Sequence, residues 1–109
     1  MDDCLQALAD PRRRQIVELL LEQDRPVGEL VQALPIAQSG VSRHLRILKD
    51  AGLVHVRAQG QQRIYGLRPE RFEELSTWLD RYRALWEERL DRFETVLKQA
   101  QSAKADKES

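Results

Sequence analysis

A short window of the chain carries side chains that can hydrogen-bond to the edges of base pairs. It contains one glutamine, two serines and two arginines, which are Gln38, Ser39, Ser42, Arg43 and Arg46. In the major groove Gln can pair with adenine and Arg with guanine, whereas Ser bonds to a base or to a phosphate. These residues are therefore candidates for reading the sequence of duplex DNA.

The same window has the apolar spacing of a helix. Val41, Leu45 and Leu48 follow one another at steps of four and three, which places them on one helical face. The candidate reading residues then lie on the opposite face. An ordinary amphipathic surface helix shows the same division, so this window alone leaves both interpretations open.

The segments before and after residues 38–48 predict where this helix begins and ends and which elements surround it. Asp10-Pro11 is typical of a helix start, because Asp caps a helix and Pro suits its first position. Gly52 is typical of a helix end. We expect helices over residues 2–9, 11–23, 27–34, 38–51 and 69–97, and a β-hairpin of residues 53–58 and 63–67 around Gly60.

This order of elements predicts a winged helix-turn-helix fold. Such a fold is mainly α with a small β-hairpin, here five helices plus a two-stranded wing. Two short helices joined by a tight turn place the second helix in the major groove, with its first residues at the base edges. The three elements together favour DNA binding over a plain surface helix.

Charge is distributed unevenly along a chain whose formal net charge is zero. Residues 38–65 carry a net charge of +4, whereas residues 1–24 carry −3 and residues 68–97 carry −2. Arg57 and Arg63 of the expected hairpin belong to the basic stretch. A basic middle between acidic flanks is a candidate phosphate-facing surface, although a solvated surface of mixed charge would give the same counts.

Three stretches resemble the ArsR family of bacterial repressors. Residues 8–16 (LADPRRRQI) are similar to the entry into that family's second helix, residues 41–54 (VSRHLRILKDAGLV) to its reading helix and the start of its wing, and residues 59–67 to its hairpin. The resemblance covers about residues 5–70 closely. It implies a symmetric dimer that represses promoter DNA and releases it when a signal arrives.

The resemblance also implies which positions contact DNA. On the reading helix and the wing these are Gln38, Ser39, Ser42, Arg43, His44, Arg46, Arg57 and Arg63. For His44, packing beside the helix is an equal alternative to a phosphate contact. Relatives often have Ser before this helix, where this chain has Ala37, and Gly40 follows in the first turn. A missing N-cap costs about 1 kcal/mol and an interior Gly nearly as much, so we expect a loosely ordered helix start without DNA.

The last expected helix has an apolar stripe longer than a small body can cover. From Phe72 to Leu79 we expect it to pack mainly within one subunit, and beyond that mainly against a second copy. The predicted dimer interface comprises Leu5, Leu8, Tyr82, Trp86, Leu90, Phe93 and Leu97. A cap on the core of the same subunit is the alternative. We expect one DNA-binding and dimerisation domain over residues 1–98 and a disordered tail over residues 99–109.

The signal that such a protein would sense is not evident. Members of the family that sense arsenic carry Cys-x-Cys at the start of the third helix, where this chain has Pro26 and Gly28. Members that sense zinc use Asp and His on the last helix, which here contains no His. We therefore expect no metal site and no cofactor, and an unidentified small-molecule effector stays open as a partner.

The single cysteine, Cys4, leaves two interpretations open. The thiol is either a redox or metalloid sensor or, as favoured, a small apolar core residue. A winged-helix module that binds only other proteins is a further alternative. No nucleophile–base pair, phosphate loop or metal cluster is evident, so we expect no enzyme. The acidic N-terminus and the lack of a long apolar run predict a cytoplasmic protein without a membrane span.

Overall fold

The computed structural model describes residues 1–108, and the side chains of residues 1–104. The chain divides into two compact units, the first from Met1 to Leu75 and the second from Ser76 onward. Five helices and three strands follow in the order α1 (Asp2–Leu8), α2 (Pro11–Glu22), β1 (Arg25–Pro26), α3 (Val27–Ala33), α4 (Gln38–Asp50), β2 (Val54–Gln59), β3 (Gln62–Leu67) and α5 (Pro69–Glu108). The expected winged helix-turn-helix class is confirmed.

The start of α2 and the end of α4 lie where the sequence predicts them. The Asp10 side chain accepts hydrogen bonds from the backbone N–H groups of Arg12 (2.8 Å) and Arg13 (3.2 Å), and Pro11 is the first residue of α2. After α4, Gly52 has a φ of +77°, a conformation that costs glycine little. These two signals delimit the segment that contains the helix-turn-helix.

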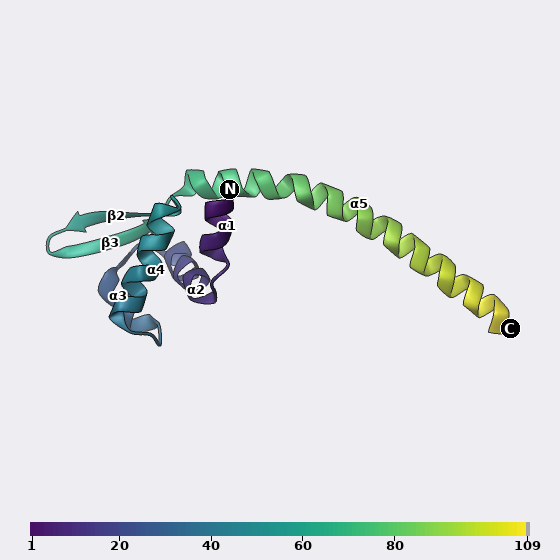
Figure 1. Cartoon of the computed structure of the whole chain (residues 1–109), viewed down its shortest axis with the longest axis horizontal. Helices are drawn as coiled ribbons and strands as arrows, with labels where there is room; N and C mark the ends of the chain where they lie inside the picture. Colours follow the sequence, from purple (N-terminus) through teal and green to yellow (C-terminus); the bar gives the residue numbers. More distant parts are fainter. Residues whose placement is uncertain (109) are drawn as a thin grey trace. The chain divides into compact units, whose positions relative to one another are not determined.

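The core of the first unit is built by α1–α4 together with the start of β2 (Figure 1). From α4, the predicted stripe Val41, Leu45 and Leu48 is at most 1% exposed. At the start of α5, Leu75 is buried and Phe72 packs against the core, as expected, whereas Leu79 is 43% exposed. Burial of a Val or Leu side chain contributes about 1.5–3 kcal/mol. The apolar face of α4 therefore fixes this helix in the unit.

The expected hairpin is present, and the sheet has one strand more than predicted. β2 and β3 are antiparallel, with Gln59 opposite Gln62 and a positive φ only at Gly60 of the two-residue loop, as a type II′ turn requires. The additional strand β1 pairs with Ile64 and Tyr65 of β3. A strand of two residues, one of them Pro26, shows no alternation that a sequence pattern could reveal. β1 connects β3 of the hairpin to the segment between α2 and α3 through backbone pairing.

The second unit consists of the rest of α5. The sequence placed the helix end near Leu97 and a disordered tail over residues 99–109, whereas the structure continues the helix to Glu108. Ser109 lies outside the described residues. Ala, Gln and Lys dominate this stretch and are strong helix formers, which explains helix without apolar periodicity. A domain boundary at residue 98 stays a prediction.

Within residues 1–108, none of the helices combines the length and the apolar character that crossing a membrane requires.

Candidate nucleic-acid interface

The polar face of α4 is an exposed surface with several hydrogen-bond donors. The side chains that the sequence proposed for base reading all lie on it, namely Gln38, Ser39, Ser42, Arg43 and Arg46. Among the side chains that the structure describes, neither Arg43 nor Arg46 forms an ion pair. Their guanidinium groups are therefore available to an acceptor outside the chain.

The first turn of α4 lacks a side-chain cap. Ala37 occupies the N-cap position, and no side chain accepts from the first backbone N–H groups of the helix. The first helical hydrogen bond runs from the N–H of Val41 to the Ala37 carbonyl at 3.1 Å. The N–H groups of Gln38, Ser39 and Gly40 therefore have no intrahelical partner.

We predict that Ala37→Ser stabilises the unit. Ala37 already has the extended backbone of an N-cap residue (φ −66°, ψ 154°), so a Ser hydroxyl would accept from the first turn at a cost of little rearrangement. The expected gain in the free energy of unfolding is about 1 kcal/mol, measured by urea denaturation. As a matched variant, Gly40→Ala is expected to give a similar gain, because the new Cβ would lie 3.6 Å from Ile36 Cδ1, an ordinary contact.

Unchanged urea midpoints for both variants would contradict this account of the helix start. Amide exchange gives an independent measurement. In the wild-type protein without DNA, the N–H groups of Ser39, Gly40 and Val41 are expected to exchange faster than those in the middle of α4. Equal protection at both places would show a firmly ordered helix start.

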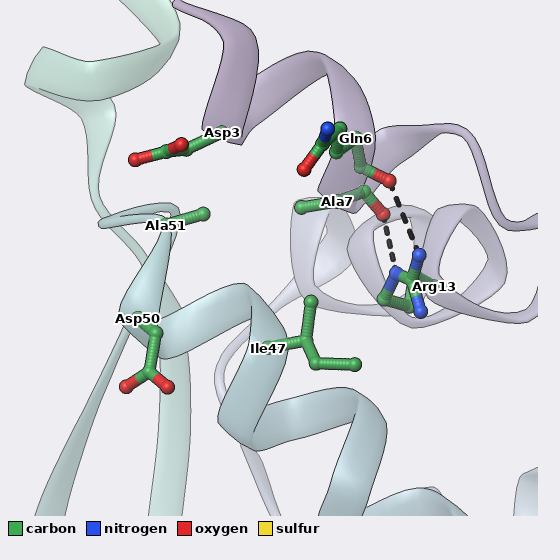
Figure 2. A pocket seen from close by; sticks show the side chains of 7 residues that line it. All are labelled: Asp3, Gln6, Ala7, Arg13, Ile47, Asp50 and Ala51. Carbon is green, nitrogen blue, oxygen red and sulfur yellow. Dashed lines mark hydrogen bonds between the residues drawn. The ribbon is translucent and has the colours of Figure 1, made fainter.

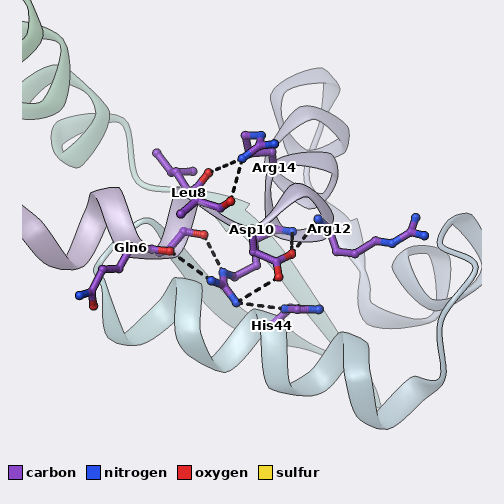
Figure 3. A network of polar contacts seen from close by, with 9 residues as sticks. Gln6, Leu8, Asp10, Arg12, Arg14 and His44 are labelled. Atoms are coloured by element: carbon purple, nitrogen blue, oxygen red, sulfur yellow. Dashed lines mark hydrogen bonds and ion pairs between the residues drawn. The ribbon is translucent and has the colours of Figure 1, made fainter.

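His44 lies apart from the base-reading residues. It is half-buried, and its Nδ1 lies 3.4 Å from Arg13 Nη1 of α2. Because a guanidinium only donates, Nδ1 is the acceptor in this contact. Arg13 Nη1 also lies 3.9 Å from Asp10 Oδ2. Figure 3 shows the network to which Asp10 and His44 belong. The structure therefore gives His44 a packing contact, and a contact with phosphate stays a prediction.

Arg13 and Arg14 also join α1 to α2. Arg13 donates to the carbonyls of Ala7 (Nε, 2.6 Å) and Gln6 (Nη2, 3.1 Å), and Arg14 Nη1 donates to those of Leu8 (2.9 Å) and Ala9 (3.0 Å). These carbonyls belong to the end of α1, where the last carbonyls of a helix lack intrahelical donors, although that of Gln6 also accepts from the Ala9 N–H at 3.2 Å. Sequence reasoning assigned no role to Arg13, because its acceptors are backbone groups that residue types do not reveal.

The charge of Asp10 is maintained by its surroundings. Partial desolvation would raise its pKa, but the backbone N–H groups of Arg13 and Arg12 and the positive charge of Arg13 outweigh it and lower the pKa below the ordinary value. The carboxylate is therefore kept in the charged form that caps α2 and faces Arg13.

The hairpin presents its two candidate arginines on opposite faces. Arg57 is paired across the ladder with Ile64, and Arg63 with Ala58, so alternation separates the two side chains. Arg57 lies 3.9 Å from Asp24, whose carboxylate covers Gly66 so closely that a Cβ there would lie 2.6 Å from Oδ1. The structure thus brings Arg57 together with Asp24 rather than with α4.

Arg63 instead lies beside the reading helix. It lines a groove of about 480 Å³ between α4 and β3, hereafter the α4–β3 groove, with residues from α3, α4 and β3: Val27, Gln38, Ser42, Leu45, Arg46, Lys49, Asp50 and Tyr65. Lys49 and Tyr65 were absent from the sequence-based candidates. Their signal was present, since Lys49 follows Arg46 by three positions on one helical face and Tyr65 follows Arg63 by two on one strand face.

A second groove separates α1 from α4. It has a volume of about 390 Å³ and is lined by Asp3, Gln6, Ala7, Arg13, Ile47, Asp50 and Ala51. Figure 2 shows the Arg13 guanidinium turned toward the carbonyls of Gln6 and Ala7. The polar groups of Arg13 are therefore largely occupied by α1.

Cys4 is a core residue. Its side chain is 0% exposed, and its Sγ donates to the Ala51 carbonyl at 3.6 Å, which also accepts from Arg71 Nε at 3.3 Å. The carbonyl thus connects α1, the end of α4 and the start of α5. The interpretation of Cys4 as a small buried residue is confirmed.

The proposed dimer residues differ in exposure. In the first unit, Leu8 is half-buried against the core and Leu5 is 37% exposed. In the second unit, the proposed residues are all exposed, from Tyr82 and Leu97 at 46% to Phe93 at 62%. Leu79, Leu85 and Val96 are also exposed there. These large apolar side chains form an exposed face of α5, and the dimer interface expected from the sequence stays a prediction.

Known proteins share this arrangement. The model of the family described as "Bacterial regulatory protein, arsR family" matches residues 10–56. The HTH-type transcriptional regulator Rv2034 of Mycobacterium tuberculosis is 47% identical over 81 residues, which are 74% of this chain and 76% of that protein. The transcriptional repressor SdpR of Bacillus subtilis is 30% identical over 79 residues, 72% of this chain and 88% of that protein.

A solved structure agrees with the sequence comparisons. The crystal structure of an ArsR family transcriptional regulator superposes with a TM-score of 0.72 at 31% identity, covering 79% of this chain and 94% of that one. The resemblance therefore extends over helices and hairpin alike.

Proposed function

Because this chain belongs to the arsR family of bacterial regulatory proteins, and is thus a transcriptional regulator, we propose that it is a repressor that binds an inverted-repeat operator as a homodimer. Its reading element is the exposed face of α4, with Arg43 and Arg46 as the residues that recognise bases. It acts in the cytoplasm, where bacterial promoters lie.

One observation carries the proposal: α4 is fixed by a buried apolar face and exposes donors on the other. Val41, Leu45 and Leu48 are at most 1% exposed, so the helix itself is held in place. The exposed arginines can then form the paired hydrogen bonds to guanine O6 and N7 that distinguish base pairs in the major groove. An ordinary surface helix also has two such faces, and the family to which this chain belongs favours DNA reading here.

The homodimer is supported by the apolar side chains of the second unit. Trp86, Leu90 and Phe93 are each more than half exposed, and a second copy of the same helix offers the same apolar residues in return. A two-fold dimer carries two reading helices, which explains why the operator is expected to be an inverted repeat. Each half of the dimer strengthens the binding of the other, because the second contact is intramolecular.

The signal that releases DNA is proposed not to be a metal. Pro26 and Gly28 supply no ligand at the position used by the arsenic-sensing members, and α5 contains no His for a zinc site. The thiol sensor through Cys4 gains no support, since this side chain is 0% exposed. An unidentified small-molecule effector stays open as the signal.

The experiment that tests the function is DNA binding by the full chain. Fluorescence anisotropy with the promoter fragment upstream of its own gene is expected to show tight binding, and a scrambled duplex of equal length should bind at least about 1,000-fold more weakly. Deletion of the gene should raise expression from that promoter. No binding to either duplex would favour the alternative of a module that contacts only other proteins, and equal affinity for both duplexes would contradict sequence-specific recognition.

A further inference from the structure

The α4–β3 groove has the composition of a site for an anion. Three cationic side chains line it, Arg46, Lys49 and Arg63, and Asp50 is the single carboxylate. Gln38, Ser42 and Tyr65 add neutral hydrogen-bond donors. Resting on the proposed function, we propose that this groove holds one phosphodiester group of the DNA backbone, with Lys49 and Arg63 as phosphate ligands from the helix and the wing.

The two walls of the groove are positioned by regular structure. Gln38, Ser42 and Lys49 recur at steps that keep them on one side of α4. Arg63 and Tyr65 are two positions apart on β3 and therefore share a face of the hairpin. β1 pairs with β3 at Tyr65 and so secures the strand beside the helix. A phosphate group in the α4–β3 groove can therefore be contacted from both α4 and β3.

The cations of the groove are not neutralised within the chain. In the part of the chain whose side chains the structure describes, none of Arg46, Lys49 and Arg63 forms an ion pair. Arg57, on the other face of the hairpin, differs because Asp24 lies 3.9 Å from it. The apolar residues Val27 and Leu45 also line the groove, and the low-polarity surface strengthens a charge-assisted hydrogen bond.

The position of Lys49 along α4 favours a backbone phosphate over a base. The donors alone do not decide between the two, because guanine also offers two acceptors in the major groove. Lys49 lies in the last turn of α4, far from the N-terminal residues that reach base edges. A contact there would therefore set the register of the helix without reading sequence. A small phosphorylated ligand would present the same chemistry, so the test must separate the two sources.

The test measures operator affinity as a function of salt for the full chain. Each phosphate contact contributes about −0.9 to the slope of log K against log salt concentration. A dimer has two copies of the groove and each copy holds one phosphate, so the double variant Lys49→Gln/Arg63→Gln is expected to reduce the magnitude of the slope by about 2, and Lys49→Gln or Arg63→Gln alone by a part of that. Each variant should weaken binding to the operator and to a scrambled duplex by the same factor. Lys98→Gln, which removes the same charge from the second unit, is expected to leave the slope unchanged.

The outcomes separate this proposal from the function on which it rests. If the wild type binds its operator specifically and neither Lys49→Gln nor Arg63→Gln changes the salt slope, only the proposed phosphate site in the α4–β3 groove is overturned. No binding of the wild type to any duplex would overturn both. In a parallel arm, the backbone resonances of Arg63 and Tyr65 are followed by NMR during titration with inorganic phosphate at constant ionic strength. Saturable shifts combined with unaffected slopes would assign the groove to a small phosphorylated ligand, against the proposal.

Discussion

Arg43→Ala is expected to abolish specific DNA binding while the protein stays folded. A bidentate arginine–guanine contact contributes about 1–3 kcal/mol of discrimination, and a dimer loses two, so Kd for the operator should rise by about 30-fold to about 20,000-fold. The Arg43 side chain is exposed and forms no ion pair in the described part of the chain. The free energy of unfolding should therefore change by about 0.5 kcal/mol at most. Anisotropy titration against operator and scrambled duplexes measures the first quantity, and urea denaturation the second.

Arg43→Lys is the matched control because it keeps the charge and removes the planar fork. A lysine attracts phosphate but does not reproduce the paired hydrogen bonds to guanine. We therefore expect this variant to bind the scrambled duplex like the wild type and to lose preference for the operator. If Arg43→Lys keeps the full preference for the operator over the scrambled duplex, Arg43 contacts a phosphate, and neighbouring residues recognise the bases.

Leu90→Glu is expected to convert a dimer into a monomer. Leu90 is 59% exposed in the second unit, between the exposed Trp86 and Phe93. If a second copy covers this surface, a buried and unpaired carboxylate there would cost several kcal/mol. Light scattering at micromolar concentration should then give the mass of one chain instead of two. Operator affinity should fall by about 100-fold or more, because the two halves no longer bind as one.

Ala84→Glu provides the matched control for this prediction. Ala84 lies six positions before Leu90, on the side of α5 that carries charged residues, and it is exposed. The same carboxylate added there should leave both mass and affinity as in the wild type. A wild-type protein that is monomeric at micromolar concentration would refute the homodimer. A Leu90→Glu variant that is still dimeric would show that the interface does not include Leu90.

Two helix boundaries within the first unit could be predicted from single residues with strong local preferences. Asp10-Pro11 marks the start of α2 and Gly52 the end of α4, because capping and a positive φ depend on the residue type itself. The buried stripe of α4 was equally readable, since its spacing is a property of the helix. The exposed reading face followed from that stripe, and which bases it contacts stays a prediction.

What could not be predicted depends on pairing between distant segments. β1 exists only because β3 lies beside it, and its two residues have no pattern of their own. The register that places Arg57 opposite Ile64, and so away from Arg63, is set by the turn at Gly60 rather than by either strand. Arg13 joins α1, Asp10 and His44 through backbone carbonyls and a ring nitrogen that no spacing rule connects.

The division of α4 into two faces has a consequence for how such regulators diverge after gene duplication. Stability resides in Val41, Leu45 and Leu48, whereas Gln38, Ser42 and Arg43 touch solvent and can change at little cost to folding. A copy of the gene can therefore drift toward a new operator through a few substitutions without passing through unfolded intermediates. Arg13 has less freedom, because its replacement would remove the donor to the Ala7 carbonyl and the contacts with Asp10 and His44. Among the descendants of such a copy, the sequence should vary most on the exposed face of α4 that contacts DNA and least at Arg13.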